Sequence, residues 1–269
     1  MVFLFFMKHQ QPIGIFDSGV GGLSVWKEIQ KLLPGEDLIY LADSMNCPYG
    51  SKSPEEIIAL SEKNTRFLLA KGCKLIVVAC NTATASAIDY LRVNFPVSFV
   101  GMEPAIKPAA MNTSTGKIGV LATKGTFEGR LFKETSKKYT AGINTIIQVG
   151  EGLVELVESN QFESEAAFEL IKKHIQPMVD AGADQIVLGC THYPFLLPVI
   201  EKIVPPTIQI VDPAPAVALR VKNLLIEERI SNDRNQGLWQ FYTTGDKATL
   251  QILLKRITGN ELLVSVIGL

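Results

Sequence analysis

A strand-and-cysteine pattern that occurs twice most constrains what this chain can fold into. Residues 75–79 are aliphatic without a polar break, and the run stops at Cys80. Such a run is typical of a strand buried on both faces of a parallel sheet, where ligands bind at the carboxyl end. The pattern returns at residues 185–192, with Cys190 standing 110 residues after Cys80. Two cysteines at equivalent strand ends indicate a pair that acts together from opposite sides.

Two further similarities occur at nearly the same spacing. Residues 118–123 repeat the pattern of residues 13–18 at an offset of 105, and residues 212–216 repeat that of residues 101–105 at an offset of 111. Strands and helices alternate along both copies, which favours parallel, doubly wound sheets. We therefore predict an α/β fold made by internal duplication: two similar doubly wound parallel-sheet domains, with the active site in the cleft between them.

The duplication also predicts the domain boundaries. Residues 1–102 together with 215–269 would form the first domain, and residues 103–214 the second. The helix, strand and helix that we predict after residue 214 have no counterpart in the repeat. We expect them to pack back on the first domain.

Composition excludes several classes of partner. The net charge is −1 and the sequence has no basic run, which argues against a nucleic-acid-binding surface. Four cysteines without a regular framework fit a reducing cytoplasm. The apolar residues 2–7 are too few to span a membrane and lack the flanks of a signal peptide, so we expect an extension or a misassigned start ahead of Met7.

A glycine-rich turn at residues 18–22 follows a short strand and leads into a helix. Free backbone N–H groups at such a turn can bind an anion. The spacing differs from G-x-G-x-x-G, and Asp17 at the strand end would repel a phosphate. A small carboxylate therefore fits this turn better than a dinucleotide does.

Four motifs resemble the signature motifs of the glutamate racemases and, more loosely, those of the wider aspartate/glutamate racemase family. In chain order they are Asp17-Ser18-Gly-Val-Gly-Gly22, Pro48-Tyr49-Gly50, Cys80-Asn81-Thr82-Ala83-Thr84 and Gly189-Cys190-Thr191-His192-Tyr193-Pro194. The resemblance covers nearly the whole chain from residue 13 to residue 246. It implies a cytoplasmic isomerase that interconverts L- and D-glutamate without a cofactor and supplies D-glutamate for peptidoglycan. A homodimer is the expected assembly.

The chemistry explains why such an enzyme has two thiols. Racemisation removes the α-proton from one face of a planar intermediate and returns a proton to the other face, so it needs one acid/base on each side. A thiol with a pKa of about 8.5 is partly deprotonated near neutrality and is tuned by its neighbours. By resemblance, Cys80 takes the proton from D-glutamate and Cys190 takes it from L-glutamate.

The resemblance also assigns auxiliary residues. Asp17 would support Cys80, and His192 would assist on the side of Cys190. Glu158 aligns best with an auxiliary glutamate of the family, while Glu151 and Glu155 remain rival candidates because the sequence departs from the family pattern there. Substrate binding would fall to short polar side chains and backbone N–H groups, which hold carboxylates without a fixed cation. These residues are Asp17, Ser18, Tyr49, Gly50, Asn81, Thr82, Thr191 and His192.

Other interpretations stay open. Cys47 and Cys73 are expected to be structural, since cysteine is among the most buried residue types. His9 and His174 are expected to be solvated. A metal site built from cysteines and His192 is an alternative, although no C-x-x-C or H-x-x-x-H pair supports it, and we expect no metal. The same fold could instead act on aspartate or another amino acid, or only bind a ligand without catalysis.

Overall fold

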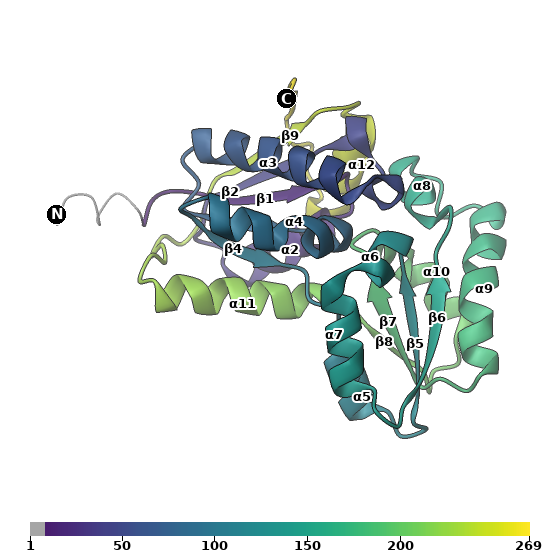
Figure 1. Ribbon diagram of the computed structural model, residues 1–269. Helices are drawn as coiled ribbons and strands as arrows, with labels where there is room; N and C mark the ends of the chain where they lie inside the picture. The colour runs from purple at the N-terminus through teal and green to yellow at the C-terminus, as the bar shows by residue number, and fades with distance from the viewer. Residues whose placement is uncertain (1–8) are drawn as a thin grey trace.

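The computed structural model describes residues 9–269 of the 269-residue chain, and the apolar residues 2–7 lie outside that part. Two parallel sheets organise the described residues (Figure 1). The larger sheet has the strand order β10-β9-β2-β1-β3-β4. Its strands are β1 Ile13–Asp17, β2 Leu38–Ala42, β3 Leu75–Val78, β4 Ser98–Gly101, β9 Trp239–Thr243 and β10 Val264–Val266.

The smaller sheet repeats the central part of the larger one. Its strand order is β6-β5-β7-β8, which corresponds to β2-β1-β3-β4 in the larger sheet. In both runs the first strand along the chain lies between the second and the third, and the fourth lies beyond the third. These strands are β5 Lys117–Ala122, β6 Asn144–Val149, β7 Gln185–Gly189 and β8 Gln209–Val211. β3 pairs with β1 as β7 pairs with β5, both in parallel. The predicted duplicated α/β fold is confirmed.

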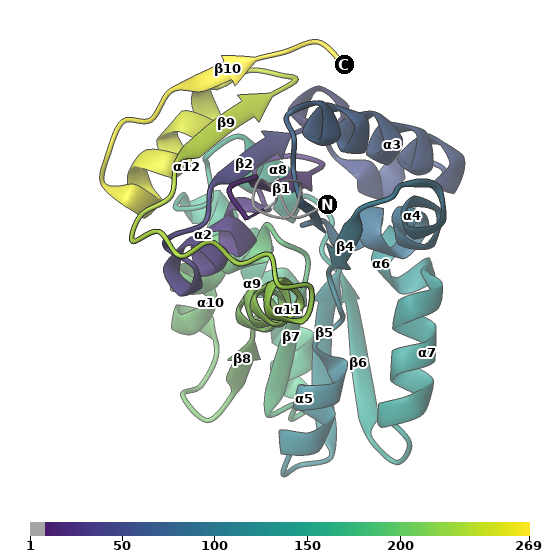
Figure 2. The same ribbon diagram turned by 90° about the vertical axis from the view of Figure 1, so that its left-hand side faces the viewer.

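Helices connect the strands and cover the faces of both sheets (Figures 1 and 2). α3 and α4 pack with one face of the larger sheet, and α2 and α11 with the other. The α-helices are α2 Leu23–Leu32, α3 Pro54–Ala70, α4 Asn81–Asn94, α5 Ile106–Asn112, α6 Lys124–Glu128, α7 Arg130–Tyr139, α8 Leu153–Glu158, α9 Glu165–Asp180, α10 Leu197–Ile203, α11 Ala214–Glu227 and α12 Ala248–Thr258. Three short 3₁₀ segments are η1 Ser44–Asn46, η2 Tyr49–Ser51 and η3 Tyr193–Leu196.

Local chemistry fixes the helix starts near the sheet ends. Ser53 caps α3: its hydroxyl accepts the N–H of Glu56 at 3.2 Å, and the Glu56 carboxylate accepts the N–H of Ser53 at 2.8 Å. This reciprocal pair satisfies two N–H groups that the helix itself leaves free. α4 begins at Asn81, because the Cys80 sulfur accepts the N–H of Ala83 and so caps the helix itself.

The end of the chain returns to the larger sheet, as expected. α11 packs on α2, and β9 pairs with β2 on the side of the sheet away from β4. β10, which the sequence did not predict, then pairs with β9. On this connectivity we propose the two domains as residues 1–102 with 215–269 and residues 103–214.

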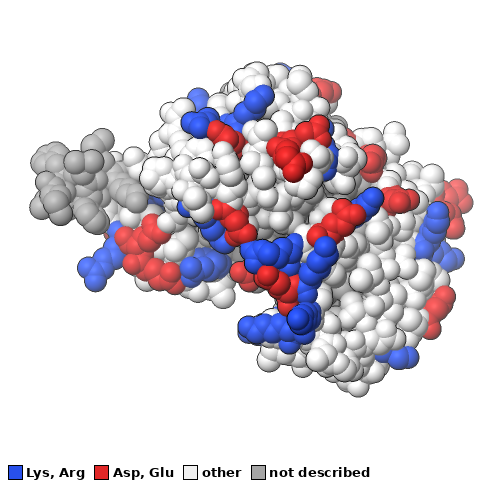
Figure 3. All heavy atoms as spheres, in the orientation of Figure 1, with Lys and Arg blue, Asp and Glu red and all other residues white. Residues whose placement is uncertain are grey.

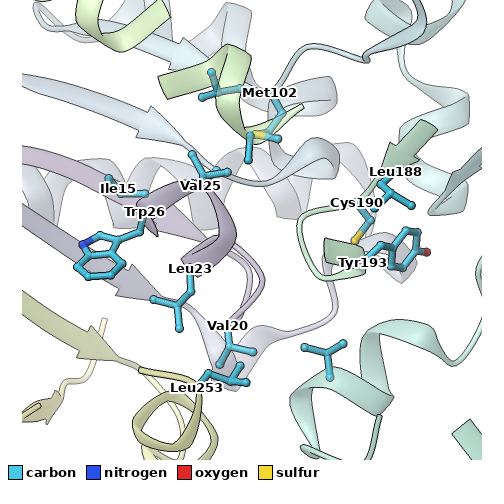
Figure 4. Packing of buried hydrophobic residues seen from close by; sticks show 14 of the residues in the cluster. Ile15, Val20, Leu23, Val25, Trp26, Met102, Leu188, Cys190, Tyr193 and Leu253 are labelled. Carbon is cyan, nitrogen blue, oxygen red and sulfur yellow. The ribbon is translucent and has the colours of Figure 1, made fainter. Parts of the chain in front are cut away.

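One cluster of buried hydrophobic residues is continuous through both halves of the protein. It includes Val20 and Trp26 from the β1–α2 region and Leu188, Cys190 and Tyr193 from the second half (Figure 4). Because apolar side chains in a shared core stabilise by leaving water together, the two sheets are held against each other. The strand ends that carry the repeated cysteine pattern therefore face a common seam.

Two further features are relevant to possible partners: the distribution of charged side chains on the surface and the length of the helices. On the face shown in Figure 3, acidic and basic side chains are interspersed and form no broad field of one sign. Within residues 9–269, every helix falls short of the length and apolarity needed to cross a bilayer.

Candidate active site

The carboxyl ends of the two sheets meet at a seam crossed by polar contacts. The Ser24 hydroxyl donates to the Thr191 carbonyl at 3.0 Å, and the Thr191 hydroxyl donates to Asp17 Oδ2 at 3.3 Å. The Val20 N–H donates to Glu158 Oε1 at 2.7 Å. Each contact joins residues more than 130 positions apart. The seam is therefore a product of tertiary packing, and the predicted site residues gather along it.

Asp17 is fully buried at the end of β1. Its carboxylate accepts the N–H groups of Ser18 at 2.7 Å and of Gly22 at 2.5 Å. Burial raises the pKa of Asp17, against the opposing effect of nearby His192. Asp17 and Glu158 together accept hydrogen bonds from three backbone N–H groups of the turn, which we expected to bind an external anion. The glycine turn thus binds carboxylates of the protein itself.

Cys80 lies two residues after the last residue of β3, Val78, and is almost completely buried. Its thiol donates to the Ser18 hydroxyl at 3.6 Å. Burial raises the pKa of Cys80, and the negative charge of Asp17 adds to this effect. A cation placed beside this thiol would act in the opposite direction and favour the thiolate.

Cys190 lies at the equivalent point after β7, beside a histidine–glutamate pair. Its sulfur is 3.7 Å from His192 Nδ1, and His192 Nε2 is 2.6 Å from Glu158 Oε1. Glu158 is the last residue of α8, whereas Glu151 and Glu155 are exposed. Of the three rival glutamates, Glu158 is the one that contacts His192.

Two glycines of the turn leave the space that this pair occupies. A Cβ atom built on Gly21 would lie 2.3 Å from His192 Nδ1, and one built on Gly19 would lie 1.9 Å from Glu158 Oε1. No side chain fits at such distances. The glycine-rich sequence is therefore required by the close approach of the second half of the protein.

The histidine–glutamate pair shifts the pKa of both members. Burial by itself lowers the pKa of His192, but its interactions with Cys190, Cys47 and Glu158 raise it well above its ordinary value of 6.5. Burial opposes the shift of Glu158, yet the contact with His192 lowers its pKa below the ordinary 4.5. The pair is therefore ionised near neutrality, as imidazolium and carboxylate.

We expect Glu158→Gln to lower the pKa of His192, because the amide cannot stabilise the imidazolium as the carboxylate does. The raised His192 pKa gives stability that is complete below about pH 6.5 and is lost as the pH rises through the folded value. The lowered Glu158 pKa gives stability that is present above about pH 4.5 and is lost in acid. The loss of stability in Glu158→Gln should therefore be largest between about pH 4.5 and about pH 6.5.

The measurements are imidazole titration by NMR and urea unfolding across pH, with Glu155→Gln as the matched control one helical turn away. An unchanged His192 titration in Glu158→Gln would contradict the assignment of this carboxylate as its partner.

The other predicted binding residues lie on the Cys80 side of the seam. Thr82 Oγ1 is 2.9 Å from Thr123 Oγ1, and a Cβ on Gly50 would touch the same threonine at 3.5 Å. The Tyr49 hydroxyl donates to Asp43 at 2.6 Å and is not free to donate elsewhere. Asn81 differs: among the described residues, its buried Nδ2 has no hydrogen-bond partner. This amide is a donor suited to a ligand carboxylate.

Sequence reasoning misplaced or missed several residues. Cys47 was expected to be structural, but its sulfur lies with the side chains of Glu158 and His192, all within 4.8 Å of one another, and burial raises its pKa to about 12. Cys73 is a buried core residue, as expected. The prediction that His174 is solvated was wrong, because this side chain is buried and its Nε2 lies 2.9 Å from the Glu151 carbonyl. His9 is partly buried, and its Nδ1 lies 2.9 Å from the Ser231 carbonyl.

Two more residues were overlooked although the pattern held a signal for them. Asp43 follows β2 directly, whereas Asp17 is the last residue of β1. Asp43 accepts hydrogen bonds from Tyr49, Asn46 and Thr244. Thr123 follows β5 and links the second sheet to Thr82. Position at the carboxyl end of a strand would have identified both.

The described residues thus form a duplicated α/β fold with a thiol at the equivalent strand end of each half. Known proteins are similar to it in sequence and in fold. The profile of the family described as Asp/Glu/Hydantoin racemase matches residues 13–221. A glutamate racemase of Herpetosiphon aurantiacus is 49% identical over 239 residues, covering 88% of this chain and 94% of that protein.

Solved structures agree. The crystal structure of a glutamate racemase isoform of Bacillus anthracis superposes with a TM-score of 0.87 at 30% identity, covering 96% of this chain and 98% of that one. An Escherichia coli glutamate racemase in complex with L-glutamate and an activator gives a TM-score of 0.85 at 32% identity, covering 96% and 99%. The chain belongs to the Asp/Glu/hydantoin racemase family, and it is an isomerase. The resemblance noted in the sequence is confirmed.

Proposed function

We propose that this protein interconverts L- and D-glutamate without a cofactor, with Cys80 and Cys190 as the two acid/base groups. The observation that carries the proposal is the equivalence of the two thiols: each follows the third strand of its half, β3 or β7, and both line one seam. The relatives reported above are named as glutamate racemases. Supply of D-glutamate for peptidoglycan, a cytoplasmic location and a homodimer belong to the same proposal.

In the proposed reaction a thiolate removes the α-proton from one face of the substrate. The electrons of the broken C–H bond pass into the α-carboxylate, and the opposite thiol then protonates the other face. From D-glutamate, Cys80 would take the proton and Cys190 would return one; from L-glutamate the roles are exchanged. The substrate leaves as its enantiomer, and the two thiols have exchanged protonation states.

Burial raises the pKa of Cys80 in the ligand-free protein, so this thiol needs help to ionise. The α-ammonium group of a bound amino acid is a cation that would favour the thiolate. Asp17, which contacts Ser18 beside the thiol, would hold that ammonium group or position Ser18. In this way the base becomes competent only when the substrate is bound.

On the other side, the imidazolium of His192 faces the Cys190 sulfur and is held by Glu158. A positive group beside a thiol stabilises the thiolate. We therefore assign His192 to the Cys190 side and Glu158 to the positioning of its ring. The Asn81 amide, the hydroxyl groups of Ser18, Thr82 and Thr191, and the backbone N–H groups of Tyr49 and Gly50 would bind the substrate carboxylates.

Circular dichroism tests the choice of substrate. Glutamate has one methylene more than aspartate, so buried donors placed for two carboxylates at one separation would be left partly unpaired by the shorter acid. Each unpaired buried group costs roughly 1–3 kcal/mol, and two or three together would give a discrimination of about a hundredfold or more. We expect L- and D-glutamate to lose optical activity with similar kcat/KM, and aspartate, alanine and glutamine to be nearly inert. Faster turnover of aspartate would move the function to an aspartate racemase on the same fold.

A further inference from the structure

Cys47, Glu158 and His192 form a compact group of metal-ligating side chains that the proposed reaction does not fully use. One ligand atom of each lies within 4.8 Å of the others. They come from three separate places in the chain: the turn after η1, the last residue of α8 and the loop after β7. Gly19 makes room for the group, since a Cβ atom there would lie 2.9 Å from the Cys47 sulfur as well as against Glu158.

The donor set matches one kind of ion. Thiolate, imidazole and carboxylate together are ligands of Zn²⁺, which binds sulfur at about 2.3 Å and nitrogen or oxygen at about 2.0–2.2 Å. Tetrahedral geometry at those bond lengths separates neighbouring ligand atoms by about 3.5 Å. The sulfur lies within 4.8 Å of the other two ligand atoms, so a small movement of the Cys47 side chain would bring it to that separation. His192 Nε2 and Glu158 Oε1, now 2.6 Å apart, would separate by roughly 1 Å, within the reach of a side-chain rotation.

The group is also accessible from solvent. A cavity of about 300 Å³ is lined by Ser44, Cys47, Pro48, Val154, Glu155, Glu158 and Ser159. Cys47 and Glu158 are thus on the wall of an open cavity, while His192 is buried behind them. An ion could enter through this cavity and keep a water molecule from it as a fourth ligand, which is the arrangement of open zinc sites.

We propose that Cys47, Glu158 and His192 bind one Zn²⁺ ion, or a similar thiolate-seeking divalent ion, with water as the fourth ligand. The ion is a reversible inhibitor and not a cofactor. It replaces the hydrogen bond between His192 and Glu158, so the imidazole can no longer serve the Cys190 side. This consequence for activity rests on the proposed function, whereas the binding itself does not.

Cobalt absorption tests binding without any reference to activity. Co²⁺ occupies zinc sites, and coordination by a thiolate gives a sulfur-to-metal charge-transfer band that the aqueous ion lacks. Titrating the reduced protein with Co²⁺ should produce this band with a stoichiometry of one ion per chain. Cys47→Ser should lose the band, and Cys73→Ser, which alters a buried cysteine elsewhere, should keep it. Added Zn²⁺ should remove the band from the wild-type protein by competition.

Two further variants locate the ion. Glu158→Gln keeps the thiol and should retain the band, but with at least about a tenfold weaker affinity for the ion. Cys190→Ser should retain the band as well. A band that persists in Cys47→Ser, or that disappears in Cys190→Ser alone, would overturn the proposal, and so would the absence of any band in the wild-type protein.

Inhibition is then measured separately. Zn²⁺ should inhibit glutamate racemisation by the wild-type protein, and a chelator should restore the rate. In Cys47→Ser the concentration for half-inhibition should rise at least about tenfold. If glutamate is not the substrate, the rate assay fails while the cobalt spectra still decide the metal site. If Zn²⁺ inhibits both proteins equally, the proposed site is not the inhibitory one.

Discussion

Cys80→Ala and Cys190→Ala should each lower kcat/KM for racemisation of glutamate by about 10²–10⁴-fold, the usual contribution of one positioned acid/base group. The loss should be equal in the two directions. L- and D-glutamate have equal free energies, so the ratio of kcat/KM values must stay at one in any variant. Circular dichroism with each enantiomer measures this. Cys73→Ala, which removes a buried thiol outside the seam, is the matched control and should keep the wild-type rate.

Hydrogen exchange with solvent distinguishes the two thiols even when racemisation is lost. In deuterated water, Cys80→Ala retains Cys190 and should exchange the α-hydrogen of L-glutamate but not that of D-glutamate. Cys190→Ala should show the reverse preference. Near wild-type racemisation by either variant, or exchange of both enantiomers by both variants, would falsify the two-thiol proposal.

Lys74→Met should destabilise the fold by about 3–5 kcal/mol, because it leaves a buried carboxylate without its cation. The Lys74 side chain is 0% exposed, and its Nζ lies 2.6 Å from Glu36 Oε2. It also donates to the carbonyls of His9 at 2.9 Å and Ile230 at 2.8 Å. This single ammonium group therefore ties together the beginning of the chain, the α2–β2 connection and the segment after α11.

Urea unfolding measures the effect, and an exposed ion pair supplies the control. Arg220 and Glu227 lie on α11 at 2.9 Å with both side chains more than half exposed. Because solvent screens such a pair, Arg220→Met should cost less than about 1 kcal/mol. The additional change Glu36→Gln in the Lys74→Met background should recover part of the loss, since it removes the buried charge. Equal destabilisation by Lys74→Met and Arg220→Met would contradict the role given to burial.

Several features of this protein are determined by the sequence alone. An unbroken aliphatic run identifies β3 and β7 as strands buried on both faces, because a parallel strand covered by helices has no polar face. The repeat of that run, each time followed by a cysteine, predicts the duplication and the two equivalent thiols. Each copy of the pattern is local, since it depends on residues within a few positions of one another, and the duplication follows from comparing the two copies.

The partners of those thiols were decided only by the tertiary structure. In the sequence Glu158 was the best-aligned of three candidate glutamates, with Glu151 and Glu155 as rivals. The packing of α8 against the β1–α2 turn brings only Glu158 to His192. Cys47 was expected to be a structural cysteine, yet its sulfur lies within 4.8 Å of the ligand atoms of Glu158 and His192. The backbone N–H groups of the glycine turn were predicted to bind an external anion, yet they donate to the carboxylates of Asp17 and Glu158.

The physical reason is the distance along the chain that these contacts join. Val20 and Glu158 are 138 residues apart, and Ser24 and Thr191 are 167 apart. Periodicity reports which face of an element is buried, but not which side chain of another element covers it. That choice follows from how the two halves pack through their shared hydrophobic core, so the sequence determined the thiols and the fold that carries them, and the packing of the halves decided what surrounds them.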